Sequence, residues 1–295
     1  AWIESKFKFL GFNITKKNNN SWAIIPPSFR FDIRIPEDLI EELARLYGYD
    51  KVPVQRLSVD ANISQISQSK VSSYDISQAL VNRGYQEVIT YSFISNEYHD
   101  LIDPSAKKIT LKNPISDDMS IMRSSLWPGL LQTVEMNQRR GHHNARFFEA
   151  GLCFGGISVD DQRQKIAGIV CGERFESQWG SPEREVDFFD AKSDVESLLS
   201  LNGSDYLFEA AEHPALQAGQ AAKISGNGQL IGWIGALSPY LQKKLSLPKL
   251  FLFELNQSDI EQRKVSSYES FSSFQASQRD IALVVAKDVN VDQLI

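Results

Sequence analysis

Strand-like apolar stretches recur through the second half of the chain, and few helical stretches separate them. Helical patterns are predicted only at about 70–83, 128–139, 187–201 and 238–245. A parallel sheet would need strands and helices in regular alternation. The order here instead predicts an α+β protein whose helices pack on an antiparallel sheet. The predicted strands and extended runs, between residues 86 and 255, are "QEVITYSF", "KKITL", "ARFFEAGLCF", "QKIAGIVCG", "YLFEAA", "AAKISG", "QLIGWIG" and "LFLFEL".

The first fifty residues have a different pattern. A helix is predicted over 3–10, and "FNITKKNNNSWAII" predicts a hairpin after it. The stretch "SFRFDIRI", residues 28–35, alternates strictly between apolar and polar positions, which predicts a half-buried strand. Pro36 suits the first turn of the next helix, and Gly48 suits its end. Helix, hairpin and helix together are typical of part of a winged-helix-like module, and the polar residues 51–69 predict a linker.

Five carboxylates lie close together between Asp32 and Glu42. At about 100° per residue, three of them share the polar face of the predicted helix, and Asp32 belongs to the segment before it. Acids in a first turn complement the helix dipole by about 0.3–1 kcal/mol each, and Glu41 and Arg45 have the spacing of a helical ion pair. A magnesium ion also prefers carboxylate oxygens. From spacing alone the helix-start interpretation is favoured, and metal binding stays open.

Charge and cysteine content narrow the class of protein. The net charge is −6, whereas a protein that coats nucleic acid without specificity is usually basic. Two cysteines cannot make a disulfide framework, so a reducing cytoplasm is expected. No apolar run approaches the length of a membrane span, and "AWIESKFKFLGF" lacks the pattern of a signal peptide. The start at Ala1 suggests a piece of a longer protein.

Four stretches resemble the bacterial phenylalanyl-tRNA synthetase beta subunit. They are "PSFRFDIRIPEDLIEELARLYGYDKVP", "MRSSLWPGLLQTVEMNQRRGHHNARFFEAGLCF", "HPALQAGQAAKISGNGQLIGWIGALSP" and "SSFQASQRDIALVV", in the order in which that family carries its counterparts. The resemblance implies the end of a helix-hairpin module at 1–50 and a class II synthetase-like antiparallel core at 70–262. It also implies the truncated start of a ferredoxin-like anticodon-binding domain at 271–295. There "RDIALVV", residues 279–285, is predicted as one strand and "VNVDQLI" as the first turns of a helix.

The resemblance changes the balance on the acidic cluster. It implies a Mg²⁺ ion shared with an alpha subunit, and the matching positions here are Asp32, Asp38, Glu41 and Glu42. With the resemblance included, metal binding is favoured over the helix-start interpretation. The implied partners are the alpha subunit, in an assembly of two alpha and two beta subunits, and the phenylalanine tRNA. ATP would be used at the alpha subunit.

The chain itself is predicted to be catalytically silent. The stretch "LFLFELNQSDIEQR" contains no glycine, although the family comparison implies that a working class II core has a glycine-rich motif there. Arg123 and Glu149 lie in motif-like surroundings, and a structural pairing is expected for Arg123 rather than ATP binding. Cys153 is expected in the core.

One basic stretch is a candidate for contact with RNA. Contacts to RNA phosphates come largely from basic side chains. Cations are equally expected at a helix C-terminus because they complement the helix dipole. Both interpretations stay open for this stretch. A stand-alone winged-helix nucleic-acid-binding protein is the alternative function, and the net charge of −6 and the long apolar-rich core argue against it. The candidate tRNA contacts are Arg139, Arg140, His142 and His143.

Overall fold

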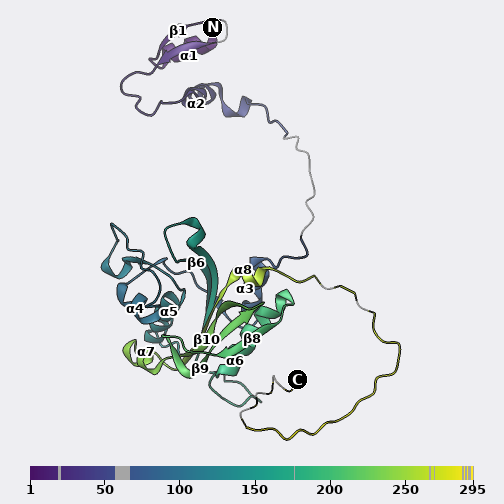
Figure 1. The fold of residues 1–295 in the computed structure, drawn as a ribbon. Coiled ribbons are helices and arrows are strands. Elements are labelled where there is room, and N and C mark those ends of the chain that lie inside the picture. The colour runs from purple at the N-terminus through teal and green to yellow at the C-terminus, as the bar shows by residue number, and fades with distance from the viewer. Residues whose placement is uncertain are drawn as a thin grey trace. The chain divides into compact units, whose positions relative to one another are not determined.

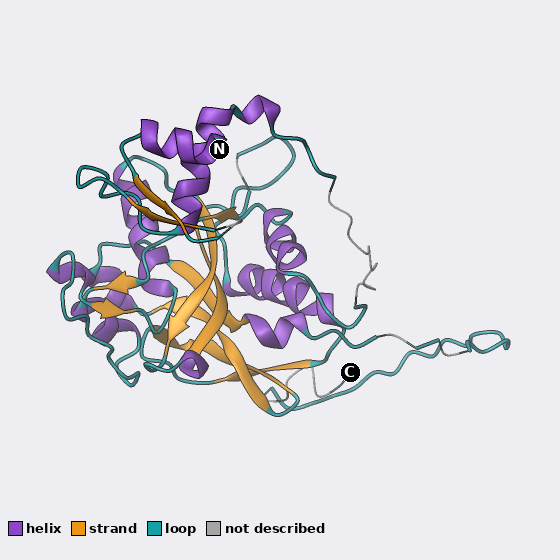
Figure 2. Cartoon of the chain, turned by 90° about the horizontal axis from the view of Figure 1, so that it is seen from above, coloured by secondary structure: helices purple, strands orange, loops and turns teal. Residues whose placement is uncertain are grey.

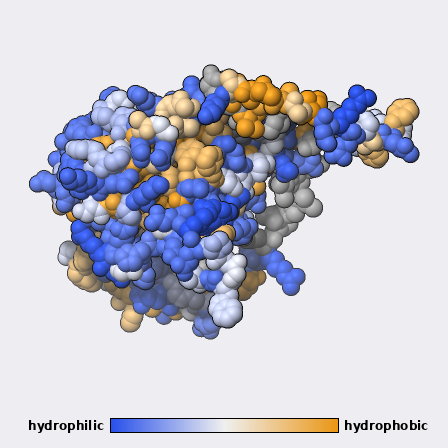
Figure 3. All heavy atoms as spheres, turned by 90° about the horizontal axis from the view of Figure 1, so that it is seen from below, coloured by the Kyte–Doolittle hydropathy of each residue, from blue (hydrophilic) through white to orange (hydrophobic). Residues whose placement is uncertain are grey.

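The computed structural model divides into two compact units, Ala1–Gln65 and Ile66–Ile295 (Figure 1). No helix in the described part is long and apolar enough to cross a bilayer. The face in Figure 3 is mainly hydrophilic, with smaller apolar areas between the blue residues. The structure describes residues 1–18, 21–56, 67–175, 177–265, 267–268, 270–287, 289, 291 and 294.

The first unit contains the predicted helix, hairpin and helix. The hairpin strands pair antiparallel from Asn13 opposite Ile25 to Lys16 opposite Trp22. Phe7 and Phe12 are buried and meet edge to face, with ring centroids 5.3 Å apart. Both helices and the hairpin are therefore confirmed. The elements are α1 (Trp2–Phe9), β1 (Asn13–Lys16), β2 (Trp22–Ile25), α2 (Pro36–Tyr47) and a 3₁₀ turn at Tyr49–Lys51.

The strand predicted at 28–35 is wrong. The backbone N–H of Arg30 donates to the Pro27 carbonyl at 2.9 Å, and those of Arg34 and Ile35 donate to the Asp38 carboxylate. These groups are satisfied within the segment, so none of the three is left for a neighbouring strand. Phe29 and Phe31, predicted to be half-buried, are 69% and 80% exposed.

The second unit is built on a seven-stranded sheet in the order β3-β6-β7-β11-β10-β9-β8. Figure 2 shows this twisted sheet with helices beside it. Five of its six pairings are antiparallel, as predicted, and the pairing of β3 with β6 is parallel. The strands are β3 (Gln86–Glu87), β6 (Ala145–Phe154), β7 (Gln162–Cys171), β8 (Tyr206–Ala210), β9 (Leu216–Gly226), β10 (Gln229–Leu237) and β11 (Leu250–Asn256).

Two runs that were predicted to be extended form little regular strand in the structure. "KKITL" forms no strand, and only Thr110 makes an isolated bridge, to Ile121. "QEVITYSF" is divided between β3 and β4 (Phe93–Ile94), and β4 pairs with β5 (Ile121–Met122) in a separate small sheet. The run breaks where Thr90 bonds to Glu149 through both its N–H and its hydroxyl.

The four helices predicted in the second unit are confirmed, whereas those at Asn96–Ile102 and Gln257–Glu261 were not predicted. Ser72 caps α3, accepting a bond from the Asp75 N–H, and Gly84 follows that helix with φ of 84°. The α-helices of the second unit are α3 (Ser73–Val81), α4 (Asn96–Ile102), α5 (Trp127–Arg139), α6 (Phe188–Leu199), α7 (Pro239–Lys244) and α8 (Gln257–Glu261), with 3₁₀ turns at Asp117–Met119, Val159–Asp161 and Ser200–Asn202.

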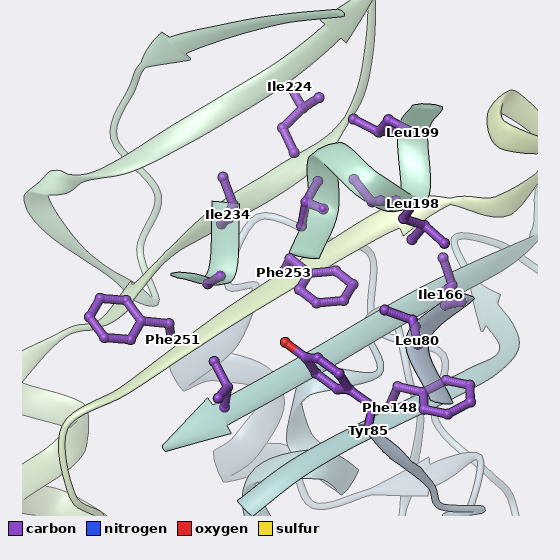
Figure 4. Packing of buried hydrophobic residues seen from close by; sticks show 14 of the residues in the cluster. Leu80, Tyr85, Phe148, Ile166, Leu198, Leu199, Ile224, Ile234, Phe251 and Phe253 are labelled. Atoms are coloured by element: carbon purple, nitrogen blue, oxygen red, sulfur yellow. The ribbon is translucent and has the colours of Figure 1, made fainter. Parts of the chain in front are cut away.

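Both faces of the sheet are covered. Phe251 and Phe253 of β11 belong to a cluster that includes Leu80 of α3 and Leu198 of α6 (Figure 4). Leu252, between them on the strand, belongs to a second cluster that contains residues of α5 and α7. Successive side chains of a strand point to opposite faces, so burial on both sides explains the nearly continuous apolar run of β11. Cys153 lies in the second cluster, as predicted.

The strand predicted at 279–285 is absent from the described residues. Residues 270–287 form neither helix nor strand, and Ile281 and Leu283 are exposed. A strand without a neighbour leaves its backbone groups unpaired. The helical turns predicted after it lie mostly outside the described residues.

Candidate functional site

The acidic cluster of the first unit is organised around Arg30. The Arg30 guanidinium lies 2.7 Å from an oxygen of Asp32 and 2.8 Å from one of Glu42. The second oxygen of Glu42 pairs with Arg45 at 2.6 Å. Arg45 had been predicted to pair with Glu41, and Glu42 had been placed on the polar face; Glu42 is instead buried, with 9% of its surface exposed.

Two further acids have distinct positions. Asp38 Oδ2 accepts hydrogen bonds from the backbone N–H groups of Arg34, at 2.7 Å, and Ile35, at 3.0 Å. A carboxylate in this place satisfies the orphan donors before a helix, which supports the helix-start interpretation although this bonding had not been predicted. Glu41 is exposed and has no side-chain partner among the described residues.

The partners of these carboxylates set their ionisation. The hydrogen bond from Arg30 lowers the pKa of Asp32, and bonds from Arg30 and then Arg45 lower the pKa of Glu42. Backbone N–H groups at Arg34 and Ile35 lower the pKa of Asp38. All three side chains are therefore carboxylates at neutral pH, which is the form that a cation requires.

The carboxylate oxygens of the acidic cluster are suitable ligands for magnesium, but their positions in the isolated chain do not form a metal site. Within the residues described, no group of three or more His, Cys, Asp or Glu side chains is placed to hold a metal ion. Arg30 occupies the space between Asp32 and Glu42, and Asp38 is engaged by the helix start. In the isolated chain, the geometry therefore favours a structural role for the carboxylates of Asp32, Asp38 and Glu42. Metal binding at Asp32, Asp38, Glu41 and Glu42 stays a prediction.

Arg123 and Glu149 form a closed pair in the core of the second unit. Arg123 Nη1 donates to Glu149 Oε1 at 2.7 Å, and Arg123 Nε donates to the Leu152 carbonyl at 2.9 Å. The other Glu149 oxygen accepts from the Thr90 hydroxyl at 2.7 Å. Because both charged groups are buried and satisfied by protein atoms, the structural pairing expected for Arg123 is confirmed.

Sequence reasoning missed a second ion pair on the sheet. Lys165 of β7 lies 2.6 Å from Oε2 of Glu254 on β11. Oε1 of Glu254 accepts from the Ser125 hydroxyl at 2.8 Å and from the Leu126 N–H at 2.7 Å. Burial alone would lower the pKa of Lys165, but the Glu254 charge outweighs it and the pKa is raised. In the sequence, the single acid inside the apolar run "LFLFEL" could have indicated this ion pair.

The four candidate tRNA contacts lie together at the end of α5. Arg139, Arg140, His142 and His143 are all exposed, and Gly141 between them has φ of 86°. Arg139 forms a surface pair with Glu135. His142 also lines a cavity of about 470 Å³ together with Arg146 and Arg174. The structure thus brings the predicted residues together on one exposed surface.

Comparisons with known proteins place both units in tRNA synthetases. The model of the "Phenylalanyl tRNA synthetase beta chain CLM domain" matches residues 52–257, and that of the "tRNA synthetase B5 domain" matches residues 1–49. The chain belongs to the phenylalanyl-tRNA synthetase beta-chain family.

Similar proteins support this membership. The phenylalanine–tRNA ligase beta subunit of Nitrosococcus oceani is 43% identical over 98% of the chain, that of Coxiella burnetii 40% over 99%, and that of Pseudomonas putida 42% over 98%. The chain spans 37% of the length of each of these relatives. A solved structure, PylSc, a pyrrolysyl tRNA synthetase of Desulfitobacterium hafniense, aligns with a TM-score of 0.47 and 13% identity over 63% of this chain and 64% of that one.

Proposed function

We propose that the chain is a noncatalytic part of a phenylalanine–tRNA ligase beta subunit. It supports the catalytic alpha subunit and helps to bind tRNA while the complex attaches phenylalanine to tRNA at the expense of ATP. The observation that carries this proposal is the identity of 40–43% with beta subunits over nearly the whole chain. The closed Arg123–Glu149 pair supports the noncatalytic role, because the Arg123 guanidinium is buried, engaged by Glu149 and not free to meet a substrate phosphate.

The finer organisation belongs to the same proposal. Residues 1–50 are the end of a winged-helix-like module, 70–262 a class II synthetase-like core and 271–295 the start of a ferredoxin-like anticodon-binding domain. Residues 51–69 are a linker, of which 57–66 lie outside the described residues. The complex contains two alpha and two beta subunits and works in the cytoplasm. Exposed cations at the end of α5 contact tRNA phosphates; they are Arg139, Arg140, His142 and His143.

The purified chain is expected to show no ATP–pyrophosphate exchange with phenylalanine. Exchange requires ATP phosphates and the amino acid to be aligned by free cations, whereas Arg123 is engaged in the core. Radiolabelled exchange, with the alpha–beta enzyme as the positive control, measures this directly. Exchange by the chain alone, abolished by Arg123→Met in a variant that still folds, would contradict the noncatalytic role.

We further propose that the four acids of the first unit hold Mg²⁺ together with the alpha subunit. For this the Arg30 guanidinium must leave the space between Asp32 and Glu42, so that alpha docking and metal binding occur together. The cation would neutralise the clustered carboxylates that Arg30 and Arg45 neutralise in the chain by itself.

Glu41→Gln should weaken Mg²⁺-dependent association with the alpha subunit by at least about tenfold, the lower end of the loss seen when the surroundings of a metal site are altered. Glu41 is exposed and has no side-chain partner in the part of the chain that the structure describes, so its replacement leaves folding intact. Glu37→Gln is the matched control, because Glu37 is an exposed acid of the same helix outside the set. Titration calorimetry with and without Mg²⁺ measures the affinity of each variant for the alpha subunit. If Glu41→Gln and Glu37→Gln had equal effects, the acids would have only their structural role at the start of the helix.

A further inference from the structure

A second cavity, of about 270 Å³, opens on the second unit. It lies where Asp103 follows α4, beside the start of α5, strands β7, β10 and β11, and the segment before β9. An adjoining cavity of about 120 Å³ shares Lys165, Trp233 and Glu254 with it. The volume is close to the lower end of the range of roughly 300–1,000 Å³ for small-molecule pockets, so only a small ligand fits.

Aromatic rings form one wall of this cavity. The His213 ring lies between two tryptophans, with centroids 5.1 Å from Trp127 and 5.0 Å from Trp233. His213 Nδ1 accepts a hydrogen bond from the Ala215 N–H at 3.2 Å, so the neutral ring carries its proton on Nε2. Burial lowers the pKa of His213, and the imidazole is therefore uncharged at neutral pH.

The side chains that line the cavity carry more negative than positive charge. Lys165 and Glu254 neutralise each other at 2.6 Å. Two further carboxylates have no cation at ion-pair distance within the described part of the chain: Asp103 accepts a side-chain hydrogen bond from the Ser105 hydroxyl, at 3.2 Å, and Glu212 is exposed without a side-chain partner. Three carboxylates and one ammonium leave the lining with a charge of −2.

We propose that this cavity binds a small organic ammonium ion. The faces of indole rings attract cations, and tryptophan does so most strongly. Asp103 and Glu212 supply the negative charge that such a ligand neutralises, while the aromatic wall contacts its alkyl groups. An anionic ligand is disfavoured because Lys165, the one cation of the lining, is already paired. The site is distinct from the acids of the first unit and from the cations at the end of α5, and it does not depend on the proposed function.

Choline and its uncharged isostere 3,3-dimethylbutan-1-ol test this proposal on the whole chain. Choline should shift the indole N–H resonances of Trp127 and Trp233 saturably at millimolar concentration, as expected for so few ligand atoms. The fully exposed Trp179 lies outside the cavity and serves as the internal reference. The isostere should give a shift at least about tenfold weaker in apparent affinity, because it offers no charge to Asp103, Glu212 or the rings.

Two variants separate charge from shape. Asp103→Asn combined with Glu212→Gln should weaken choline binding by about tenfold, and Trp233→Leu by roughly 3- to 30-fold, the range of desolvated cation–aromatic contacts. Glu87→Gln, an exposed acid outside the cavity, is the matched control and should change nothing. Equal binding of the isostere, an unchanged affinity in the charge variant, or no saturable shift of either indole would overturn the proposal.

Discussion

Glu149→Ala is expected to lower the free energy of unfolding of the second unit by about 3–5 kcal/mol, the usual cost of removing one partner from a buried ion pair. Glu149 is 2% exposed and accepts from Arg123 and from both donors of Thr90. Without it, the Arg123 charge stays in the core with its remaining bonds to protein oxygens. Urea unfolding followed by far-ultraviolet circular dichroism measures the loss.

Two variants make the Glu149 prediction specific. Glu135→Ala removes a pair with Arg139 on the surface, where such pairs contribute about 0–1 kcal/mol, so its effect should be small. Arg123→Met combined with Glu149→Leu removes both charges and should recover much of the stability lost in Glu149→Ala. A loss below about 1 kcal/mol in Glu149→Ala would contradict the assignment of this pair to the core.

Asp194→Ala should be similarly destabilising, by about 3–5 kcal/mol. Asp194, on α6, is 4% exposed and accepts hydrogen bonds from Arg83 at 2.8 Å, Arg146 at 2.8 Å and the Tyr85 hydroxyl at 3.0 Å. Its loss leaves two arginines and one buried hydroxyl without their shared acceptor.

Tyr85→Phe is the comparison for Asp194→Ala, since it removes one donor and keeps the carboxylate. It should cost about 0.5–1.5 kcal/mol, the usual net value of one hydrogen bond. The same thermal or urea unfolding measures both variants. The Tyr85 ring, which meets Phe253 edge to face with centroids 6.1 Å apart, is retained in this variant. If Tyr85→Phe were as damaging as Asp194→Ala, the hydroxyl, and not the two arginines, would be the dominant partner of the Asp194 carboxylate.

Regular patterns in the sequence predicted the fold well where elements are long. The six strands from β6 to β11 and the helices α2, α5 and α6 have apolar periodicity over many residues, and tertiary packing agrees with that local preference. The alternation at 28–35 misled because it records only side-chain order. Hydrogen bonds from the backbone of that segment to the flanking residues Pro27 and Asp38 determine its path instead.

The sites were harder to predict than the fold because their partners are distant in sequence. The acids near α2 could be identified, but the position of Arg30 between Asp32 and Glu42 follows from the turn that replaces the predicted strand. The cavity on the second unit joins Asp103 to Trp233, and no local pattern links them. By contrast, the cations at the end of α5 are adjacent in sequence, and their common surface could be expected from spacing.

The most direct test of the proposed function is the mass of the species formed when the purified chain is mixed with the alpha subunit of a related ligase and Mg²⁺. Native mass spectrometry, with Glu41→Gln and Glu37→Gln measured in parallel, reports both assembly and its dependence on the acidic cluster. We predict a complex that contains both chains, retained in Glu37→Gln and reduced in Glu41→Gln. Separate chains at every Mg²⁺ concentration, together with a gel shift of DNA by this chain alone, would contradict the role in supporting the alpha subunit.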